Sequence, residues 1–375
     1  MAAAADEKPT GWTLDGHLEA GITFNPAQPA GSSNFGNSFG DKANQLLLNQ
    51  AMLDLERHVP EAEDEIGWGI TLQGMFGTDS RYTHNFGEFQ RLTHSRDQFD
   101  LLEASFQLHV PQWALDVKFG QFMTPIGYET IDATANGLYS HSYIFNFGDP
   151  YKQVGMLATG HLSSGIDLYF GLDSGENGGW WPDDYNNTPI KLTAGIGATL
   201  ADGDLTLLLL SHIGADHPPG QPRTGAGESR QIDDLVMNWK VSPQLTLSSE
   251  VNYSDDRFFG AVAYGVAQYA TYTRDDGIKL IGRAELWRDN GGAFTASYPG
   301  FFDFVAAERG QPSQSIGGGR TLYGELTFGA NLPFGDHLLL RPEFRWDASL
   351  NNTHPFERGR SASSVTPAID AIIKF

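Results

Sequence analysis

The sequence predicts an all-β fold, a single closed antiparallel β-barrel of about sixteen strands that crosses a membrane. Three observations predict it: apolar and polar residues alternate with a period of two, the alternating segments run for about 10 to 15 residues, and the connections between them are short and long in turn. Strands of soluble proteins are typically about 5–6 residues long, whereas tilted membrane strands need about 9–11. The long segments therefore favour a membrane barrel over a soluble sandwich.

The first segment shows the alternation clearly. One face carries Trp12, Leu14, Gly16, Leu18, Ala20, Ile22 and Phe24, and the other carries Thr13, Asp15, His17, Glu19, Gly21, Thr23 and Asn25. Such a strand has one apolar face and one polar face. The same division recurs in segments 65–73, 102–110, 113–119, 190–199, 245–253, 322–332 and 337–347. Aromatic residues stand toward the ends of several apolar faces, as in the belts at the two membrane interfaces.

The connections between these segments set the number of strands. The short ones are Pro60–Asp64, Pro111–Gln112, Ser163–Gly165, Ala201–Gly203, Ser242–Gln244, Thr273–Gly277 and Pro333–Asp336. The long ones are Pro26–Ala43, Ser80–Asp97, Tyr128–Pro150, Ser174–Asn187, Gly214–Ser229, Asp255–Phe259, Asp289–Gly319 and Ala348–Ser361. Their strict alternation predicts short periplasmic turns at one rim, long extracellular loops at the other, and both termini on the short-turn side.

Composition agrees with a barrel and excludes several other classes of protein. The mean hydropathy is only −0.32, but every second residue of a membrane strand faces water. No apolar run approaches the roughly 18 residues of a membrane helix. A formal net charge of −22 argues against nucleic-acid binding, which needs a basic face. The absence of Cys excludes disulfides and thiolate chemistry.

The N-terminus predicts an exported protein. Small residues followed by acidic ones, over Met1–Glu7, resemble the stretch around a signal-peptidase site, without the basic and apolar regions of the signal itself. We therefore expect a mature chain whose signal peptide is absent from this sequence. Residues 1–10 are expected to be a flexible N-terminus and residues 11–375 the barrel domain.

Charged residues on the polar faces are the candidate pore lining. The acidic ones are Asp15, Glu19, Asp54, Glu56, Glu103 and Asp116. The basic ones are Lys118, Lys191, Lys240, Lys279, Arg283, Arg341 and Arg345. A closed barrel would bring an acidic arc and a basic arc to one lumen, where they would orient polar solutes. The alternative is that they form salt bridges, for example between Arg345 and Glu343, which hold the wall rigid.

The loop Tyr128–Pro150 is a candidate constriction. It follows Pro125 and Gly127, lies between two strong strands, and carries Glu129, Asp132, Tyr139 and Tyr143 as its candidate functional residues. A long acidic and aromatic loop of this kind would narrow the pore if it folded inward. The alternative is an external cap.

Catalytic and metal chemistry is not indicated. Ser211 and His212 are adjacent in a strand, so their side chains point to opposite faces, and Ser140-His141-Ser142 lies in the loop without an evident orienting partner. The His residues show no metal-ligand spacing. We expect no catalytic residue, no metal and no cofactor. The run from Trp180 to Asn186 suggests sugar stacking, cation binding by its acidic pair, or a loop packed by its own aromatics.

One stretch resembles a known family. Gly120-Gln121-Phe122-Met123-Thr124-Pro125-Ile126-Gly127-Tyr128-Glu129, continued by Ser140-His141-Ser142-Tyr143, Pro150 and Gly155-Met156, is similar to the β-barrel porin-2 (OmpL-like) family of outer-membrane porins. The C-terminus resembles an outer-membrane assembly signal, since Ile369, Ala371 and Ile373 alternate with polar residues up to a terminal Phe375. Pro367 departs from that pattern, and we expect it near the start of the strand or at a bulge.

The resemblance and the pattern together predict a porin of the cell outer membrane. Its expected function is passive diffusion of small hydrophilic solutes or ions through a polar lumen. The alternatives are an outer-membrane hydrolase and a plugged structural or adhesion barrel. Expected partners are outer-membrane lipid and lipopolysaccharide, the diffusing solutes, and no nucleic acid. A homotrimer is a further expectation, with the small residues Gly16 and Ala20 as the contact patch.

Overall fold

The computed structural model describes residues 11–29, 32–60, 65–85, 88, 95–175, 178–180, 190–215, 229–257, 260–295 and 319–375. The N-terminal ten residues and most of the Trp180–Asn186 run lie outside this part of the chain. So do residues 30–31, 61–64, 86–87, 89–94, 176–177, 181–189, 216–228, 258–259 and 296–318.

The described residues form sixteen strands that close into one antiparallel barrel, as predicted. The strands are β1 (Trp12–Thr23), β2 (Leu46–Arg57), β3 (Gly67–Gly77), β4 (Gln98–Val110), β5 (Leu115–Met123), β6 (Lys152–Ser163), β7 (Ile166–Asp173), β8 (Lys191–Leu200), β9 (Leu205–Ala215), β10 (Ser229–Lys240), β11 (Leu245–Asp256), β12 (Ala261–Thr273), β13 (Lys279–Asp289), β14 (Thr321–Phe334), β15 (Leu338–Ser349) and β16 (Ser363–Lys374). Helical turns are short: α1 (Ser80–Thr83), η2 (Pro111–Trp113), η3 (Ala133–Ala135), η4 (Ile144–Gly148) and η5 (Ala201–Gly203).

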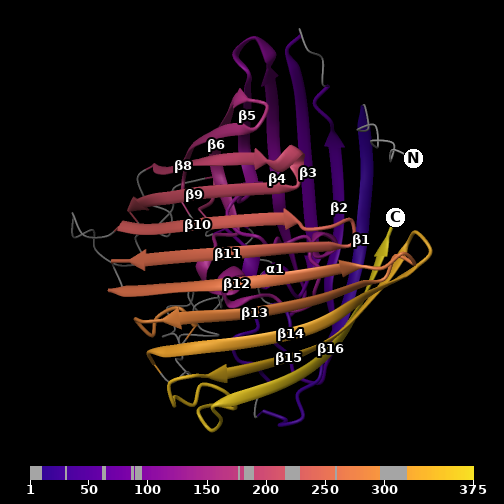
Figure 1. Ribbon diagram of the computed structural model, residues 1–375, viewed down its shortest axis with the longest axis vertical. Coiled ribbons are helices and arrows are strands. Elements are labelled where there is room, and N and C mark those ends of the chain that lie inside the picture. Colours follow the sequence, from indigo (N-terminus) through magenta and orange to yellow (C-terminus); the bar gives the residue numbers. More distant parts are fainter. Residues whose placement is uncertain are drawn as a thin grey trace.

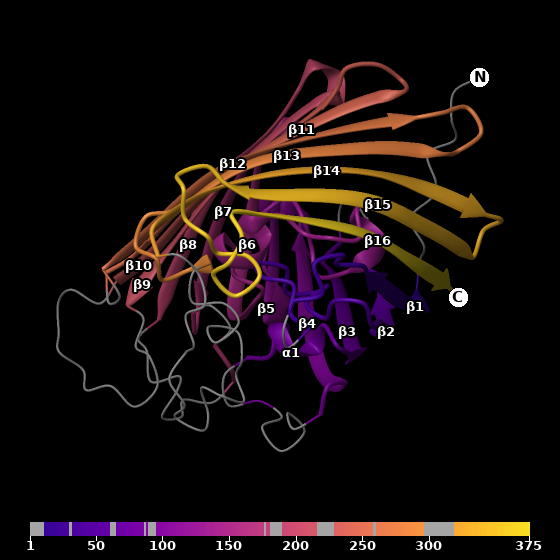
Figure 2. The same cartoon turned by 90° about the horizontal axis from the view of Figure 1, so that it is seen from below.

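Each strand pairs with its sequence neighbours, and β1 pairs with β16 to close the ring. In Figure 1 the tilted strands β8–β16 lie in front and β1–β5 lie behind them, and Figure 2 shows the two walls facing each other. The register shifts between Glu19 and Ala20 in β1 and between Gln73 and Gly74 in β3. Short turns join β2 to β3, β4 to β5 and so on to β14 and β15, on the side where β1 starts and β16 ends.

The two faces of each strand have the exposures that alternation predicts. The apolar faces point outward, where Leu14 is 68% exposed and Phe328 is 63% exposed. The polar faces point inward, and many of their residues are buried; Arg345, for example, is 1% exposed. Outward apolar side chains and inward polar ones are what lipid outside a barrel requires. Among the described residues no helix is long and apolar enough to cross a membrane.

The inside of the barrel is more densely packed than the sequence predicts. The loop 24–45 between β1 and β2 and the loop 124–151 between β5 and β6 both place buried aromatic residues within the ring. Phe39 of the first loop contacts Phe145 and Tyr151 of the second, with ring centroids 5.4 and 6.0 Å apart. Tyr143 contacts Tyr323 of β14 at 5.0 Å. The lumen is therefore polar at its wall but partly aromatic at its centre.

The last strand closes the barrel at a seam. Phe375 and Gly16 exchange two backbone hydrogen bonds of 3.0 Å, and any side chain on Gly16 would meet the Phe375 ring. Pro367 lies in the first half of β16, opposite Phe344, and its carbonyl accepts from the Phe24 amide just beyond the end of β1. The side of Pro367 that lacks an N–H therefore faces the point at which β1 stops pairing with β16. Because the Phe375 ring covers Gly16, the small-residue patch predicted for subunit contact is not open at that residue.

Candidate functional site

The second inner loop enters the barrel at a glycine that no other residue could replace without strain. Gly127 has a positive φ of 98°, and a Cβ there would lie 2.3 Å from Asp149 Oδ2 at the other end of the loop. The next amide, of Tyr128, donates to Glu250 Oε1 of β11 at 2.8 Å. The close approach of the two loop ends and this first contact direct the chain across the lumen.

Inward glutamates of three strands hold the loop through its backbone amides. Glu250 of β11, Glu285 of β13 and Glu343 of β15 each accept from the loop. Besides the Tyr128 contact, the bonds are from Tyr143 N (2.6 Å) and Ile144 N (2.8 Å) to Glu285, and from Tyr139 N (2.9 Å) and Ser140 N (3.1 Å) to Glu343. The loop main chain is thus fixed to three separate strands of the wall.

Inward arginines hold the same loop through its carbonyls. Arg283, Arg341 and Arg345 are buried, and each contacts the loop. Arg283 donates to Ser140 O (2.7 Å), Arg341 to Ala133 O and Asn136 O (2.8 Å each), and Arg345 to His141 O (2.5 Å). Alternating Glu and Arg on the inner wall therefore match the alternating donors and acceptors of the loop main chain.

Carboxylates neutralise these arginines. Arg283 pairs with Glu325 (3.1 Å) and with Glu129 of the loop (2.7 Å). Arg341 pairs with Asp370 (2.8 Å) and with Glu19 of β1 (2.7 Å), and Arg345 pairs with Asp347 (2.8 Å). For these three arginines the contacts support the salt-bridge interpretation, with Asp347 in place of Glu343 as the partner of Arg345. The pair of Arg341 and Glu19 also connects the predicted basic arc of lining residues to the predicted acidic arc.

Glu129 lies at the centre of this network. Its Oε1 accepts from Arg283 and from the Tyr269 hydroxyl (3.1 Å), and its Oε2 lies 2.8 Å from His141 Nδ1 and accepts from Ser142 N (3.0 Å). Burial alone would raise the pKa of Glu129, but Arg283 and then His141 outweigh it and hold that pKa at about 2. Burial lowers the pKa of His141. Glu129 is therefore a buried, fully satisfied carboxylate.

The other predicted residues of the loop have different surroundings. The Tyr139 hydroxyl donates to Asn49 Oδ1 (3.0 Å), and the Tyr143 hydroxyl donates to Asp347 Oδ1 (2.8 Å). Asp132 caps the short helix η3 by accepting from the Thr134 amide (2.7 Å), and its side chain keeps 26% of its surface exposed. Of the four candidates, Asp132 is the one that still faces open space.

The exposure of the predicted lining residues differs with their position along the barrel axis. Glu19, Glu103, Lys191, Arg283, Arg341 and Arg345 are buried, whereas Asp15, Asp54, Glu56, Asp116 and Lys118 keep partial or full exposure on β1, β2 and β5. Lys118 is paired with Glu103 at 2.9 Å. Lys240 and Lys279 are exposed at the short-turn ends of β10 and β13. The exposed lining near the short turns thus carries more acidic than basic groups on the β1–β5 side.

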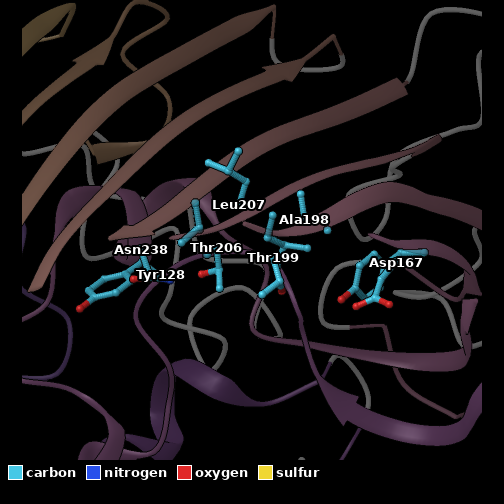
Figure 3. Close-up of a pocket in the computed structure, with 12 residues that line it drawn as sticks. Tyr128, Asp167, Ala198, Thr199, Thr206, Leu207 and Asn238 are labelled. Atoms are coloured by element: carbon cyan, nitrogen blue, oxygen red, sulfur yellow. The ribbon is translucent and has the colours of Figure 1, made fainter. Parts of the chain in front are cut away.

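A chamber of about 360 Å³ lies inside the barrel beside the start of the loop. Its wall is formed by β7–β10 and its polar groups include Tyr128, Asp167, Thr199, Thr206 and Asn238. Figure 3 shows Thr199 and Thr206 between the aromatic ring of Tyr128 and the carboxylate of Asp167. Hydroxyls, an amide and a carboxylate around an aqueous space can exchange hydrogen bonds with a polar solute as it passes.

A chain of His and Asp side chains leads to this chamber along the short-turn half of the wall. Asp116 lies 2.5 Å from His109 Nδ1 and 3.0 Å from His161 Nε2, and His161 Nδ1 lies 2.7 Å from Asp167. The four residues come from the adjacent strands β4–β7. Sequence reasoning placed Asp116 and His109 on polar faces but did not bring them together, and it did not consider His161 and Asp167, which alternation would have placed on the same side.

Sequence reasoning also passed over most of the carboxylates that bind the loop. Glu250, Glu343 and Asp347 stand on the polar faces of their segments, but nothing in a single strand shows what they contact. Spacing offered one usable signal, because Arg283-x-Glu285 and Arg341-x-Glu343-x-Arg345 put opposite charges on one face two residues apart. The aromatic residues of loop 24–45 gave no such signal.

The serines and histidines considered for catalysis form no nucleophile–base pair among the described residues. His212 lies 3.0 Å from Asp173, while Ser211 is on the outer face. His141 does have an orienting partner, Glu129, which sequence reasoning did not find. However, Ser142 Oγ accepts from the Phe145 amide and Ser140 Oγ accepts from Arg283, and the His141 ring stacks on Phe145 at 4.1 Å.

A closed membrane barrel of sixteen strands with a charged inner wall and a loop across its lumen defines an outer-membrane porin, a channel for passive diffusion. Over residues 11–375 the chain matches the family described as "Putative beta-barrel porin-2, OmpL-like", and it belongs to this family. The predicted resemblance, fold and function are thereby confirmed, and the protein is an integral protein of the outer membrane. Family and fold indicate a channel rather than an enzyme.

Solved porin-like structures share the fold at low sequence identity. The outer-membrane channel DcaP of Acinetobacter baumannii is 12% identical, with a TM-score of 0.60 over 98% of this chain and 99% of that one. OmpF of Salmonella typhi in complex with daunomycin is 10% identical, with a TM-score of 0.62 over 97% of both chains. OprB of Pseudomonas putida is 12% identical, with a TM-score of 0.59 over 97% and 94%. No curated protein matches the sequence.

Proposed function

We propose that the loop 128–150 is the constriction of this porin and that solutes pass beside it through the chamber on the β7–β10 wall. One observation carries the proposal: buried Glu and Arg side chains of the opposite wall bind the loop main chain by its amides and its carbonyls. A loop held in this way stays inside the barrel. The open space adjoining its first residues, Gly127 and Tyr128, is then the route that remains.

The diffusing solutes are small and hydrophilic, and cations are modestly preferred. The buried arginines are neutralised by carboxylates, so they add little net charge to the route. The groups with exposed surface near the short turns include Asp15, Asp54, Asp116 and Asp167, against Lys118, which is paired with Glu103, and Lys240 and Lys279 at the ends of β10 and β13. Acidic linings favour cations.

The surroundings of the barrel follow from its outer face. Outer-membrane lipid covers the apolar side chains, lipopolysaccharide contacts the long-loop rim, and the chain reaches the membrane as an exported precursor. Barrels of this size commonly assemble as trimers, and we propose a homotrimer. Ala20 and its neighbours would contribute to the contact, while the Phe375 ring covers Gly16.

Planar-bilayer recording of the purified chain tests the proposal. We expect stepwise conductance and, under a KCl gradient, a reversal potential whose sign shows modest cation preference. Replacing Asp116 and Asp167 by Asn should reduce that preference. Anion preference in the native chain would overturn the charge assignment, and a folded but silent barrel would overturn the channel route and favour the plugged alternative.

The hydrolase alternative has a separate test. Detergent-activated esterase or protease activity that disappears in His141→Ala or Ser211→Ala would support it. We expect no such activity, since each candidate seryl oxygen considered above either binds another group or faces outward.

A further inference from the structure

Three carboxylates meet where the two ends of the inner loop join the wall. Asp234 of β10 and Glu250 of β11 are 2% and 1% exposed, and Asp149, near the end of the loop, is 9% exposed. One oxygen of each lies within 4.8 Å of an oxygen of the other two. The three residues are far apart in the sequence, which explains why spacing patterns predicted no metal site.

Neutral hydrogen-bond donors reach only some of the carboxylate oxygens in this cluster. Asn252 Nδ2 donates to Asp149 Oδ1 (2.9 Å) and to Asp234 Oδ2 (3.1 Å), and the Tyr128 amide donates to Glu250. Asp149 Oδ2 has no hydrogen-bond donor, and it lies on the Glu250 side of the cluster: a Cβ on Gly127 would be 2.3 Å from this oxygen and 3.5 Å from Glu250 Oε1. Within the described part of the chain, no Lys, Arg or His forms an ion pair with any of the three residues. Buried charges are ordinarily paired or bound to a metal.

We propose that Asp149, Asp234 and Glu250 bind a divalent metal cation, Ca²⁺ in particular. Ca²⁺ takes oxygen ligands at about 2.3–2.6 Å, so ligands of one ion lie no more than about 5 Å apart, and the three oxygens here meet that limit. Carboxylates bind this ion through one or both oxygens, and water completes its shell of about six to eight ligands. The unpartnered Asp149 oxygen is the ligand that the loop supplies.

The site has a structural consequence at the loop hinge. Gly127 and Tyr128 begin the crossing and Asp149 ends it, and both ends contact the same pair of strands through the cluster. A cation there would join the entry and the exit of the loop to β10 and β11. This inference concerns binding of an ion and does not depend on conduction.

Calorimetry with Ca²⁺ on the full, detergent-folded chain after chelator treatment tests the site. We expect one Ca²⁺ per chain in the wild type, with binding weakened at least about tenfold in Asp149→Asn and in Glu250→Gln. Ca²⁺ should raise the thermal unfolding midpoint of the wild type and leave that of Asp149→Asn unchanged. Without Ca²⁺, Asp149→Asn should be no less stable than the wild type, because the change removes a repelling charge.

Glu103→Gln is the matched control. Glu103 is also a buried, inward carboxylate, but it already has Lys118 as its partner at 2.9 Å. The Glu103→Gln variant should bind Ca²⁺ as the wild type does.

A proton shared among the three carboxylates is the competing explanation, because burial, then Glu250 and Asp234, raise the pKa of Asp149. A wild-type chain that binds no Ca²⁺ at pH 8, or equal binding in wild type and Asp149→Asn, would overturn the metal site.

Discussion

At the scale of single residues, Glu129 shows how this barrel uses buried charge. An isolated carboxylate inside a protein would cost several kcal/mol, yet here it has a cation and three further contacts. Removing one member of such a set leaves the others unsatisfied. The stability of the loop therefore depends on complete sets of partners more than on any one salt bridge.

Glu129→Gln should loosen the loop. The change leaves Arg283 with Glu325 but removes its second carboxylate, and we expect a loss of about 3 kcal/mol in the free energy of unfolding, at the lower end for a broken buried pair. Urea unfolding in detergent measures the loss, and single-channel recording should show greater open-channel noise. Asp132→Asn is the control in the same loop, because Asp132 is partly exposed and is expected to change stability little. Equal effects of both variants would contradict the role of Glu129.

The pH dependence of that stability has a defined sign. The pKa of Glu129 falls from 4.5 to about 2 on folding, so its stabilisation is complete above about pH 4.5 and is lost as the pH falls toward 2. At about 1.4 kcal/mol per unit the shift is worth roughly 3 kcal/mol. The difference in unfolding free energy between wild type and Glu129→Gln should thus stay constant from pH 7 to 5 and shrink by pH 3. A difference that shrinks near pH 6 would show that another group titrates.

At the scale of elements, the inner loop is the feature that alternation could not place. Period-two patterning predicted the strands and turns because each strand has lipid on one side. The loop has no such constraint, and its path depends on contacts with residues more than 200 positions away, such as the 204 positions between Tyr139 and Glu343. Sequence reasoning identified it as acidic, aromatic and inserted between strong strands. The choice between an inward loop and an external cap, and the part played by loop 24–45, needed three-dimensional contacts.

A disulfide can test whether the loop stays inside during conduction. A Cβ on Gly137 would lie 3.4 Å from a side-chain carbon of Ile281 on β13, and the native chain has no Cys. Gly137 lies directly against the Ile281 side chain, so the pair Gly137→Cys and Ile281→Cys places two thiols at this contact between loop and wall. We expect ready oxidation on non-reducing gels and the same conductance before and after reduction. Conductance that appears only on reduction would mean that solutes need the loop to leave the lumen, and the single mutants control for the substitutions.

At the scale of the whole molecule, one closed sheet separates the lipid outside the barrel from the polar lumen inside it. Leu326 and Phe334 both point outward from β14, the first in the middle of the strand and the second at its short-turn end. Leu326→Arg should cost about 2–4 kcal/mol in lipid, because a charge at mid-membrane depth is poorly solvated. Phe334→Arg should cost about 0–1 kcal/mol near the interface. Unfolding in lipid vesicles measures both, and equal costs would contradict this placement of the membrane.

The pairing of β1 with β16 has a consequence for biogenesis. β1 cannot complete its hydrogen bonds until β16 has been made, because its second partner is the strand farthest from it in the sequence. Ring closure is then the final event of assembly, and Phe375 is part of it through its bonds to Gly16. Loss of β16 would leave β1 and β15 each with an unpaired edge inside the membrane, where unsatisfied backbone groups are costly, so a chain without this strand should not insert as a stable barrel.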